Sequence, residues 1–161
     1  MGSLYRSQHE LILVFKHGTK PHINNIALGR FGRHRSNVWN YPSILSDRHT
    51  EEGDMLALHP TVKPVQMVAD AILDCSRRGD IVLDPFLGSG TTLLAAQRVG
   101  RVCHGIEIDP LYVDTAIHRL QRFTGEDAIH ESTGETFTRR QASLASSQPT
   151  ARRSRKGVAR G

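Results

Sequence analysis

A glycine-rich turn between a strand and a helix is the feature that most constrains the fold of this 161-residue chain. The run Ile81–Asp84 is rich in β-branched residues and predicts a buried parallel strand. The turn Pro85–Gly90 follows, and residues 91–99 predict a helix that ends at Gly100. Glycines in such a turn let the backbone approach a ligand closely, and the helix N-terminus offers free N–H groups to an anion. We therefore expect a ligand with an anionic group at this turn.

The residues around the turn predict alternating helices and strands. Apolar side chains at positions 65, 68, 69, 72 and 73 follow the spacing of an amphipathic helix, for which Gly79 is the expected C-terminal cap. Residues 102–108 predict a second strand, and a further helix opens at Pro110 after the expected cap residue Asp109. The order helix, strand, turn, helix, strand, helix predicts a parallel α/β unit.

The two ends of the chain differ from this central unit. The apolar run 11–15 predicts a buried strand, so we assign residues 1–16 to a strand that precedes the loop region. Residues 17–58 have no sustained period and form an irregular loop region, which is usually functional or disordered. Residues 59–126 form the α/β unit. Residues 127–161 lose periodicity, are rich in Ser, Thr and Arg towards the end, and predict a disordered basic tail.

Charge divides the chain in the same way. The formal net charge is +5, but residues 1–50 hold seven basic and two acidic side chains, and residues 51–137 hold seven basic and fourteen acidic ones. Residues 138–161 hold seven basic and no acidic side chains. A basic protein with an acidic centre does not simply coat a polyanion.

Membrane, secreted and metal-binding classes find no support in the composition. No apolar run approaches the roughly 20 residues that span a bilayer, and the first residues lack the apolar stretch of a secretory signal. Cys75 and Cys103 lie in apolar periodic segments and predict buried reduced thiols. We therefore expect a cytoplasmic chain with no membrane partner and no metal site.

An acidic residue near the turn narrows the ligand class. Glu107 follows Gly90 by seventeen positions, at the end of the second expected strand, where a carboxylate accepts hydrogen bonds from ribose hydroxyls. A nucleoside triphosphate site would have Lys directly after Gly90, and a dinucleotide site would have glycine in place of Leu93. A tight turn without a ligand also fits the residues. The pattern therefore favours a nucleoside-containing ligand and leaves nicotinamide binding and an empty turn as alternatives.

Three segments resemble motifs of the DNA methyltransferases that modify exocyclic amines. Asp84–Thr92 looks like that family's cofactor motif, and His59–Pro64 resembles its second cofactor-side motif. Gly105–Tyr112 resembles its acidic ribose-binding strand end, and residues 5–15 resemble the strand that precedes its DNA-reading loop. By this resemblance, residues 1–16 hold a strand of the catalytic half and residues 17–58 are the DNA-recognition loop region. The resemblance implies the Rossmann-like α/β fold of S-adenosylmethionine-dependent methyltransferases. This fold has three layers, α/β/α, in the whole family and is expected to be incomplete here. The disordered basic tail would follow it.

The resemblance also assigns residues to S-adenosylmethionine. By that likeness Asp84 lies near the methionine ammonium, Phe86 packs beside the cofactor and Glu107 holds the ribose hydroxyls. The methionine carboxylate would be held by the backbone of Gly88, Ser89, Gly90 and Thr91. The opposite wall of the pocket would be formed by Thr61, Lys63 and Pro64. For Lys63, a solvated charge at the helix entry is the alternative.

A basic and aromatic loop occupies the position of the family's DNA-reading region. Arginine contacts phosphates or guanine edges, and aromatic rings stack on exposed bases. We expect contact with double-stranded DNA through Arg30, Arg33, Arg35 and Trp39. The alternative is a solvated loop that Trp39 and Tyr41 anchor to the core.

The family's catalytic motif, of the form Asp/Asn/Ser-Pro-Pro-aromatic, has no counterpart, since no two of the seven prolines are adjacent. We therefore assign no catalytic residue. The resemblance implies the C-terminal segment of a longer enzyme, whose N-terminal catalytic half is a candidate partner chain.

The implied reaction is site-specific methyl transfer to the exocyclic amine of adenine, in preference to cytosine, as in restriction-modification systems. An inactive cofactor- or DNA-binding remnant is the first alternative. A nicotinamide-dependent oxidoreductase is the second.

Overall fold

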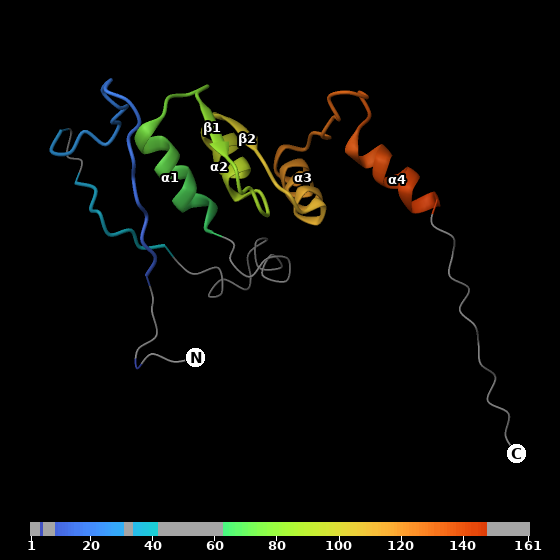
Figure 1. Cartoon of the computed structure of the whole chain (residues 1–161), viewed down its shortest axis with the longest axis horizontal. Helices are drawn as coiled ribbons and strands as arrows, with labels where there is room; N and C mark the ends of the chain where they lie inside the picture. The colour runs from blue at the N-terminus through green and yellow to red at the C-terminus, as the bar shows by residue number, and fades with distance from the viewer. Residues whose placement is uncertain (1–3, 5–8, 31–33, 42–62, 148–161) are drawn as a thin grey trace, which may run out of the picture.

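The computed structural model describes residue 4 and residues 9–30, 34–41 and 63–147 (Figure 1). The two strands run parallel, and the helix between them forms the crossover. This arrangement confirms the predicted α/β unit. The elements in chain order are α1 (Val65–Cys75), β1 (Ile81–Asp84), α2 (Thr91–Val99), β2 (Val102–Gly105), α3 (Pro110–Thr124) and α4 (Phe137–Ser147).

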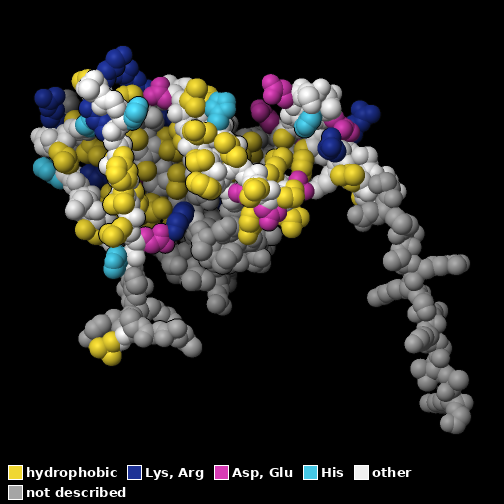
Figure 2. Space-filling model, in the orientation of Figure 1, with side chains coloured by type: hydrophobic (Ala, Val, Ile, Leu, Met, Phe, Trp, Pro, Cys, Tyr) yellow, Lys and Arg dark blue, Asp and Glu magenta, His cyan; other side chains and the backbone are white. Residues whose placement is uncertain are grey.

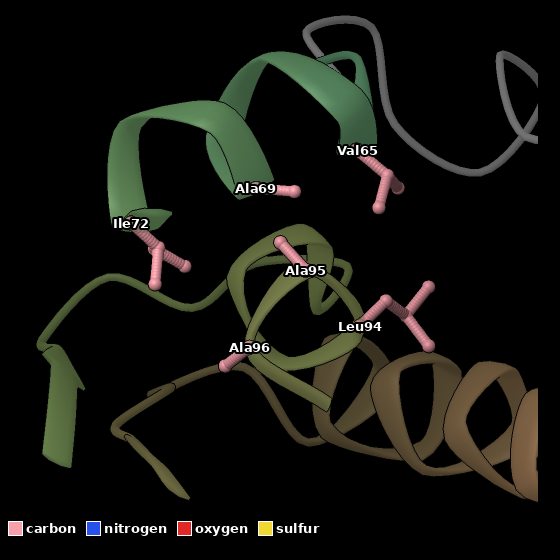
Figure 3. Close-up of a cluster of buried hydrophobic side chains, with 6 residues drawn as sticks. All are labelled: Val65, Ala69, Ile72, Leu94, Ala95 and Ala96. Atoms are coloured by element: carbon pink, nitrogen blue, oxygen red, sulfur yellow. The ribbon is translucent and has the colours of Figure 1, made fainter. Parts of the chain in front are cut away.

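The core lies between α1 and α2. The two helices contribute a cluster of buried side chains whose three alanines, nearly free of solvent, let the helix backbones approach closely (Figure 3). Val82 of β1, Cys103 of β2 and Leu120 of α3 pack against this cluster. The three helices therefore cover one face of the strand pair. The cluster consists of Val65, Ala69, Ile72, Leu94, Ala95 and Ala96.

The opposite face of the strands is open. Ile81, Leu83 and Val102 are 68%, 63% and 49% exposed, and Figure 2 shows hydrophobic side chains on the surface of this part of the molecule. The prediction of a buried strand at 81–84 is therefore only half right, because the strand pair is covered on one side. Within the residues that the structure describes, the fold consists of two layers, helices on a sheet.

Capping residues end or begin most helices where the sequence predicts them. Asp109 Oδ1 accepts a hydrogen bond from the backbone of Leu111 at 2.9 Å, and Gly100 and Gly125 close α2 and α3 in the left-handed conformation. Gly79 is different, since α1 ends at Cys75 and its C-cap is Ser76, whose hydroxyl donates to the carbonyl of Ile72. The expected cap at Gly79 is therefore wrong.

The two thiols have different environments. Cys75 is exposed, which corrects the prediction of a buried thiol, because it lies outside the face of α1 that buries Ala69 and Ile72. Cys103 is partly buried, and this burial, together with the nearby Asp84 charge, raises the pKa of its thiol.

The expected buried strand at residues 11–15 is also wrong. These residues are extended but belong to no strand, and their apolar side chains, Leu11 to Phe15, are between 55% and 90% exposed. The segment runs beside α1, on the side away from the strands (Figure 1). A helix satisfies its own backbone hydrogen bonds, so α1 offers this run no edge with which to pair.

The N-terminal segment, which we define as residues 9–30 and 34–41, caps α1 instead. Asn25 donates from its backbone to the carbonyl of Asp74 at 2.9 Å. Its side-chain amide donates to the carbonyls of Leu73 and Ser76 at 2.8 and 2.7 Å. The last carbonyls of a helix have no partner within the helix, and Asn25 supplies donors to three carbonyls at this end.

Regular structure continues beyond the predicted boundary at Glu126. Ile129 and Thr136 form an antiparallel bridge, and α4 follows it. The Phe137 ring meets the His118 ring of α3 edge to face, with centroids 5.0 Å apart. This contact orders a sequence whose polar composition predicts disorder, so the expected disordered tail is wrong for residues 129–147. Residues 148–161 lie outside the described residues.

In the described part of the chain, no helix combines the length and apolar character that crossing a membrane requires.

Candidate cofactor-binding turn

The glycine-rich turn, residues 85–90, begins where β1 ends and is tied to the chain beyond β2. Ile106 donates from its backbone to the carbonyl of Asp84 at 2.9 Å, and Leu87 donates to the carbonyl of Ile106 at 2.9 Å. The Asp84 carboxylate accepts from the backbone of Phe86 at 3.0 Å, which shapes the first residues of the turn. The turn therefore continues the parallel pairing of the sheet.

Glycine is required at the end of this turn for two reasons. Gly88 and Gly90 have φ values of +54° and +84°, in the left-handed region that side chains disfavour. A Cβ on Gly90 would also lie 2.8 Å from the Cβ of Ala116 on α3. The close packing of α3 therefore depends on the missing side chain at residue 90.

Glu107 lies beside the turn, as the sequence predicts. One of its carboxylate oxygens accepts from the backbone N–H of Gly88 at 2.7 Å, and the other accepts from that of Asp109 at 2.9 Å. A carboxylate has roughly four lone-pair directions, so each of its oxygens can accept more than one hydrogen bond. The side chain is only partly buried.

The start of α2 completes the candidate site. Gly90 is the N-cap of α2 and provides no side-chain cap, so the first N–H groups of the helix are available to an acceptor. Ser89 and Thr91 are buried, and the Ser89 side chain turns towards α3. Ser89 can therefore serve a ligand only through its backbone. The Phe86 ring stands beside the turn and is 88% exposed.

The second predicted wall of the pocket is only partly described. Pro64 is the N-cap of α1, and the Lys63 ammonium pairs with the carboxylate of Glu10. This ion pair joins the start of α1 to the N-terminal segment. Thr61 lies outside the described residues. The role of these three residues at a cofactor stays a prediction.

Two of the predicted DNA contacts are held against α1. Arg35 pairs with Asp74 at 3.1 Å, and its guanidinium carbon lies 4.7 Å from the centre of the Trp39 ring. Trp39 in turn meets Tyr41 edge to face at 6.5 Å. Arg30 is exposed, and Arg33 lies outside the described residues.

Two acidic residues of α1 receive these contacts. The Tyr41 hydroxyl donates to Asp70 at 2.6 Å, and both burial and this neighbouring carboxylate raise the pKa of Tyr41. Burial raises the pKa of Asp74, while the Arg35 charge opposes the rise. Tyr41 thus anchors the N-terminal segment to α1, and Trp39 packs against Tyr41 and Arg35. Contact of Trp39 with DNA stays a prediction.

Sequence reasoning missed Arg119, a buried arginine on α3. Its guanidinium donates to the carbonyl and to the hydroxyl of Ser89 at 2.6 and 3.2 Å. Arg119 falls three residues after Ala116 and directly before Leu120, within the apolar stripe of α3. An arginine at such a position is a signal of a buried polar contact, because arginine is rarely buried without partners.

Comparison with known proteins decides the family. A model of the N6/N4 methyltransferases, described as DNA methylase, matches residues 3–118, which is more than half of the chain. The chain belongs to this family. DNA methylases of this family use S-adenosylmethionine as the methyl donor.

The relatives are longer than this chain. Type II methyltransferase M.ScaI of Streptomyces caespitosus is 39% identical over 90 residues, which cover 56% of this chain and 29% of M.ScaI. Type II methyltransferase M.BglII of Bacillus subtilis is 33% identical over 145 residues, covering 77% of this chain and 39% of M.BglII. This N6/N4 methylase chain therefore spans well under half the length of these relatives.

A solved structure, the complex of M1.HpyAVI with S-adenosylmethionine, is 44% identical over 38% of this chain and 32% of M1.HpyAVI, with a TM-score of 0.37.

Proposed function

We propose that this chain is the cofactor-binding and DNA-recognition segment of a site-specific DNA methyltransferase. It would transfer a methyl group from S-adenosylmethionine to the exocyclic amine of adenine, which the family resemblance favours over cytosine. The observation that carries the proposal is the glycine-rich turn braced against Glu107, at the N-terminus of α2. This arrangement offers an anion site and a ribose site at the carboxyl ends of two neighbouring parallel strands, where ligands of α/β folds bind.

The described residues offer one partner for each of the three polar parts of S-adenosylmethionine, two through side chains and one through the backbone. The cofactor supplies an activated methyl group on a sulfonium centre. The first N–H groups of α2 and the backbone of Ser89 and Thr91 would bind the methionine carboxylate, and Gly88 and Gly90 would give it room to approach the turn. Asp84 would balance the ammonium, and Glu107 would accept hydrogen bonds from the ribose hydroxyls. Phe86 is exposed beside the turn and would cover one side of the bound molecule. Thr61, Lys63 and Pro64 would form the opposite wall.

The N-terminal segment would contact double-stranded DNA. Its proposed contacts are unequal, because Arg30 is exposed whereas Arg35, which pairs with Asp74 of α1, and Trp39 are partly buried. We expect Arg30 to contribute attraction to phosphate, and Arg35 with Trp39 to hold the segment in place while presenting their remaining surface. Arg33 is the fourth proposed contact.

Catalysis would need a motif that this sequence does not contain. The family resemblance places a polar residue followed by two prolines and an aromatic residue at the target amine, and no adjacent prolines occur here. We propose that such a catalytic segment acts together with this chain, on a longer protein or as a separate partner chain. The DNA substrate implies a cytoplasmic location.

Calorimetric titration tests the cofactor assignment. We expect saturable binding of S-adenosylmethionine and none of oxidised nicotinamide adenine dinucleotide. Glu107→Gln should weaken S-adenosylmethionine binding by about 10-fold or more, because a charged acceptor of a hydrogen bond is lost. Glu131→Gln, an exposed residue far along the chain from the turn, is the matched control and should leave the affinity unchanged. Binding of the nicotinamide nucleotide alone would replace the proposal with an oxidoreductase.

Transfer of a radiolabelled methyl group to duplex DNA tests the reaction. The chain would be assayed alone and with a separately produced catalytic segment of a relative, and the modified base identified by mass spectrometry. We expect N6-methyladenine only when the catalytic segment is present. N4-methylcytosine would correct the target base, and cofactor binding without transfer in either mixture would show an inactive remnant.

A further inference from the structure

The glycine-rich turn carries a continuous series of hydrogen bonds that joins two opposite charges. Arg119 of α3 donates to the carbonyl of Ser89 at 2.6 Å. The N–H of the same peptide group, on Gly90, donates to the carbonyl of Leu87 at 3.0 Å. The N–H of that next peptide group, on Gly88, donates to a carboxylate oxygen of Glu107 at 2.7 Å. A guanidinium and a carboxylate are thus connected through two peptide groups.

Both peptide groups point the same way along this series. Each accepts a hydrogen bond at its carbonyl from the side of the cation and donates its N–H towards the anion. A peptide that accepts a strong hydrogen bond becomes a better donor, so bonds in such a series strengthen one another. The bonds at the two ends involve charged groups and are the stronger kind. The series therefore holds both peptide planes of the turn in one orientation.

Arg119 is buried at the point where α3 packs against the glycine-rich turn. The side chain is only 7% exposed, and the neighbouring Ala116 on the same face of α3 packs against Gly90. A buried guanidinium carries a large cost unless its donors are satisfied, and here the hydroxyl of Ser89 accepts from it as well. Ala116 sets how closely α3 approaches the turn, and Arg119 fixes which way the turn faces.

We infer that Arg119 is a positioning residue for the ribose end of the cofactor, acting on Glu107 through the Ser89–Gly90 and Leu87–Gly88 peptides. This inference rests on the proposed function, since it assigns Glu107 to the ribose. Loss of Arg119 frees the Ser89 peptide, weakens the Gly88 hydrogen bond and lets the Glu107 carboxylate reorient. Arg119 itself touches no part of the ligand.

A double-mutant cycle tests the coupling. Arg119→Met and Glu107→Gln are compared singly and together in calorimetric titrations of the full chain with S-adenosylmethionine. Each single variant should weaken binding by about 10-fold. The double variant should bind S-adenosylmethionine only slightly more weakly than the weaker-binding single variant, because both substitutions act through one series of hydrogen bonds. Fully multiplicative losses in the double variant would overturn the inference.

Conservative and matched variants separate positioning from general damage. Arg119→Lys can still donate to the Ser89 carbonyl and should recover most of the affinity that Arg119→Met loses. Arg122→Met removes an exposed arginine from the same helix and should bind as the unmodified chain does. Equal losses in the Lys and Met variants would contradict the role assigned to Arg119.

A ligand-free measurement keeps the inference apart from the proposed function. In amide NMR spectra of the chain without ligand, Glu107→Gln should shift the Gly90 amide proton, and Arg119→Met should shift the Gly88 amide proton and speed its exchange. Arg122→Met should shift neither. If S-adenosylmethionine fails to bind but each variant shifts the amide at the opposite end of the series, the coupling of Arg119 to Glu107 is supported and the cofactor assignment is wrong. If each variant shifts only its adjacent amide, the inference itself is wrong.

Discussion

The glycine-rich turn and the N-terminal segment both lack regular structure, but they are held by different kinds of contact. Successive backbone hydrogen bonds to residues beyond β2, and a glycine packed on Ala116, hold the turn. The N-terminal segment is attached to α1 mainly through side chains, with Asn25 at one end of the helix and Lys63 with Glu10 at the other. Local stability differs across a structure according to such contacts. The turn should therefore behave as part of the core, and the N-terminal segment as a separately detachable layer.

Substitution at the turn should have the largest effect on stability. Gly90→Ala places a Cβ against Ala116 in a left-handed backbone conformation, and we expect a loss of about 3 kcal/mol from the free energy of unfolding. Urea titration followed by circular dichroism measures this loss. Gly134→Ala is the matched control, since Gly134 has a φ of +67° but open space around it, and should lose about 1 kcal/mol. Equal losses would mean that α3 does not press on the turn.

Detaching the N-terminal segment should have a smaller effect. Asn25→Ala removes two side-chain donors from the end of α1, and we expect a loss of about 1–2 kcal/mol. Limited proteolysis should cut within residues 9–30 several-fold faster, while amide exchange of the turn stays unchanged. Asn37→Ala, at an exposed position of the same segment, should leave both measurements as they are. Faster exchange at Gly88 or Gly90 in Asn25→Ala would show that the two regions are coupled.

The apolar run at residues 11–15 should tolerate a charge with almost no effect. Leu13 is 73% exposed, so Leu13→Lys should change the free energy of unfolding by no more than about 0.5 kcal/mol. A loss of several kcal/mol in the urea titration would show that this run is buried in solution. The buried Leu94 provides the reference, since Leu94→Ala should cost about 2–5 kcal/mol.

The sequence predicts the elements whose ends are set by neighbouring residues. Asp109 caps α3, Gly100 closes α2, and the strand at residues 81–84 follows from its β-branched side chains, because each signal acts within a few residues. The run 11–15 has the same apolar signal as a strand, but pairing depends on what lies beside it, and the neighbour here is α1. Local patterns do not specify such partners.

In the candidate site, too, some contacts follow from the local sequence and others depend on how distant elements pack. The placement of Glu107 beside the turn follows from counting residues through a parallel crossover, and the structure brings the two together. The contact between Arg119 and Ser89 joins residues thirty positions apart and depends on how α3 packs, which no local pattern gives. The order of residues 129–147 was missed for a similar reason, because it depends on the contact of Phe137 with His118.

The register of the two strands makes chain length a determinant of the site. Asp84 pairs with Gly105, so the turn and Glu107 emerge side by side from neighbouring strands. One residue inserted between Gly105 and Glu107 would move the Glu107 side chain to the other side of the backbone, because successive residues of an extended chain face opposite ways. Exposed positions of α2, such as Gln97 and Arg98, can change freely without this effect. The spacing between the end of β2 and Glu107 therefore determines which way this carboxylate faces, and an engineered variant must keep that spacing.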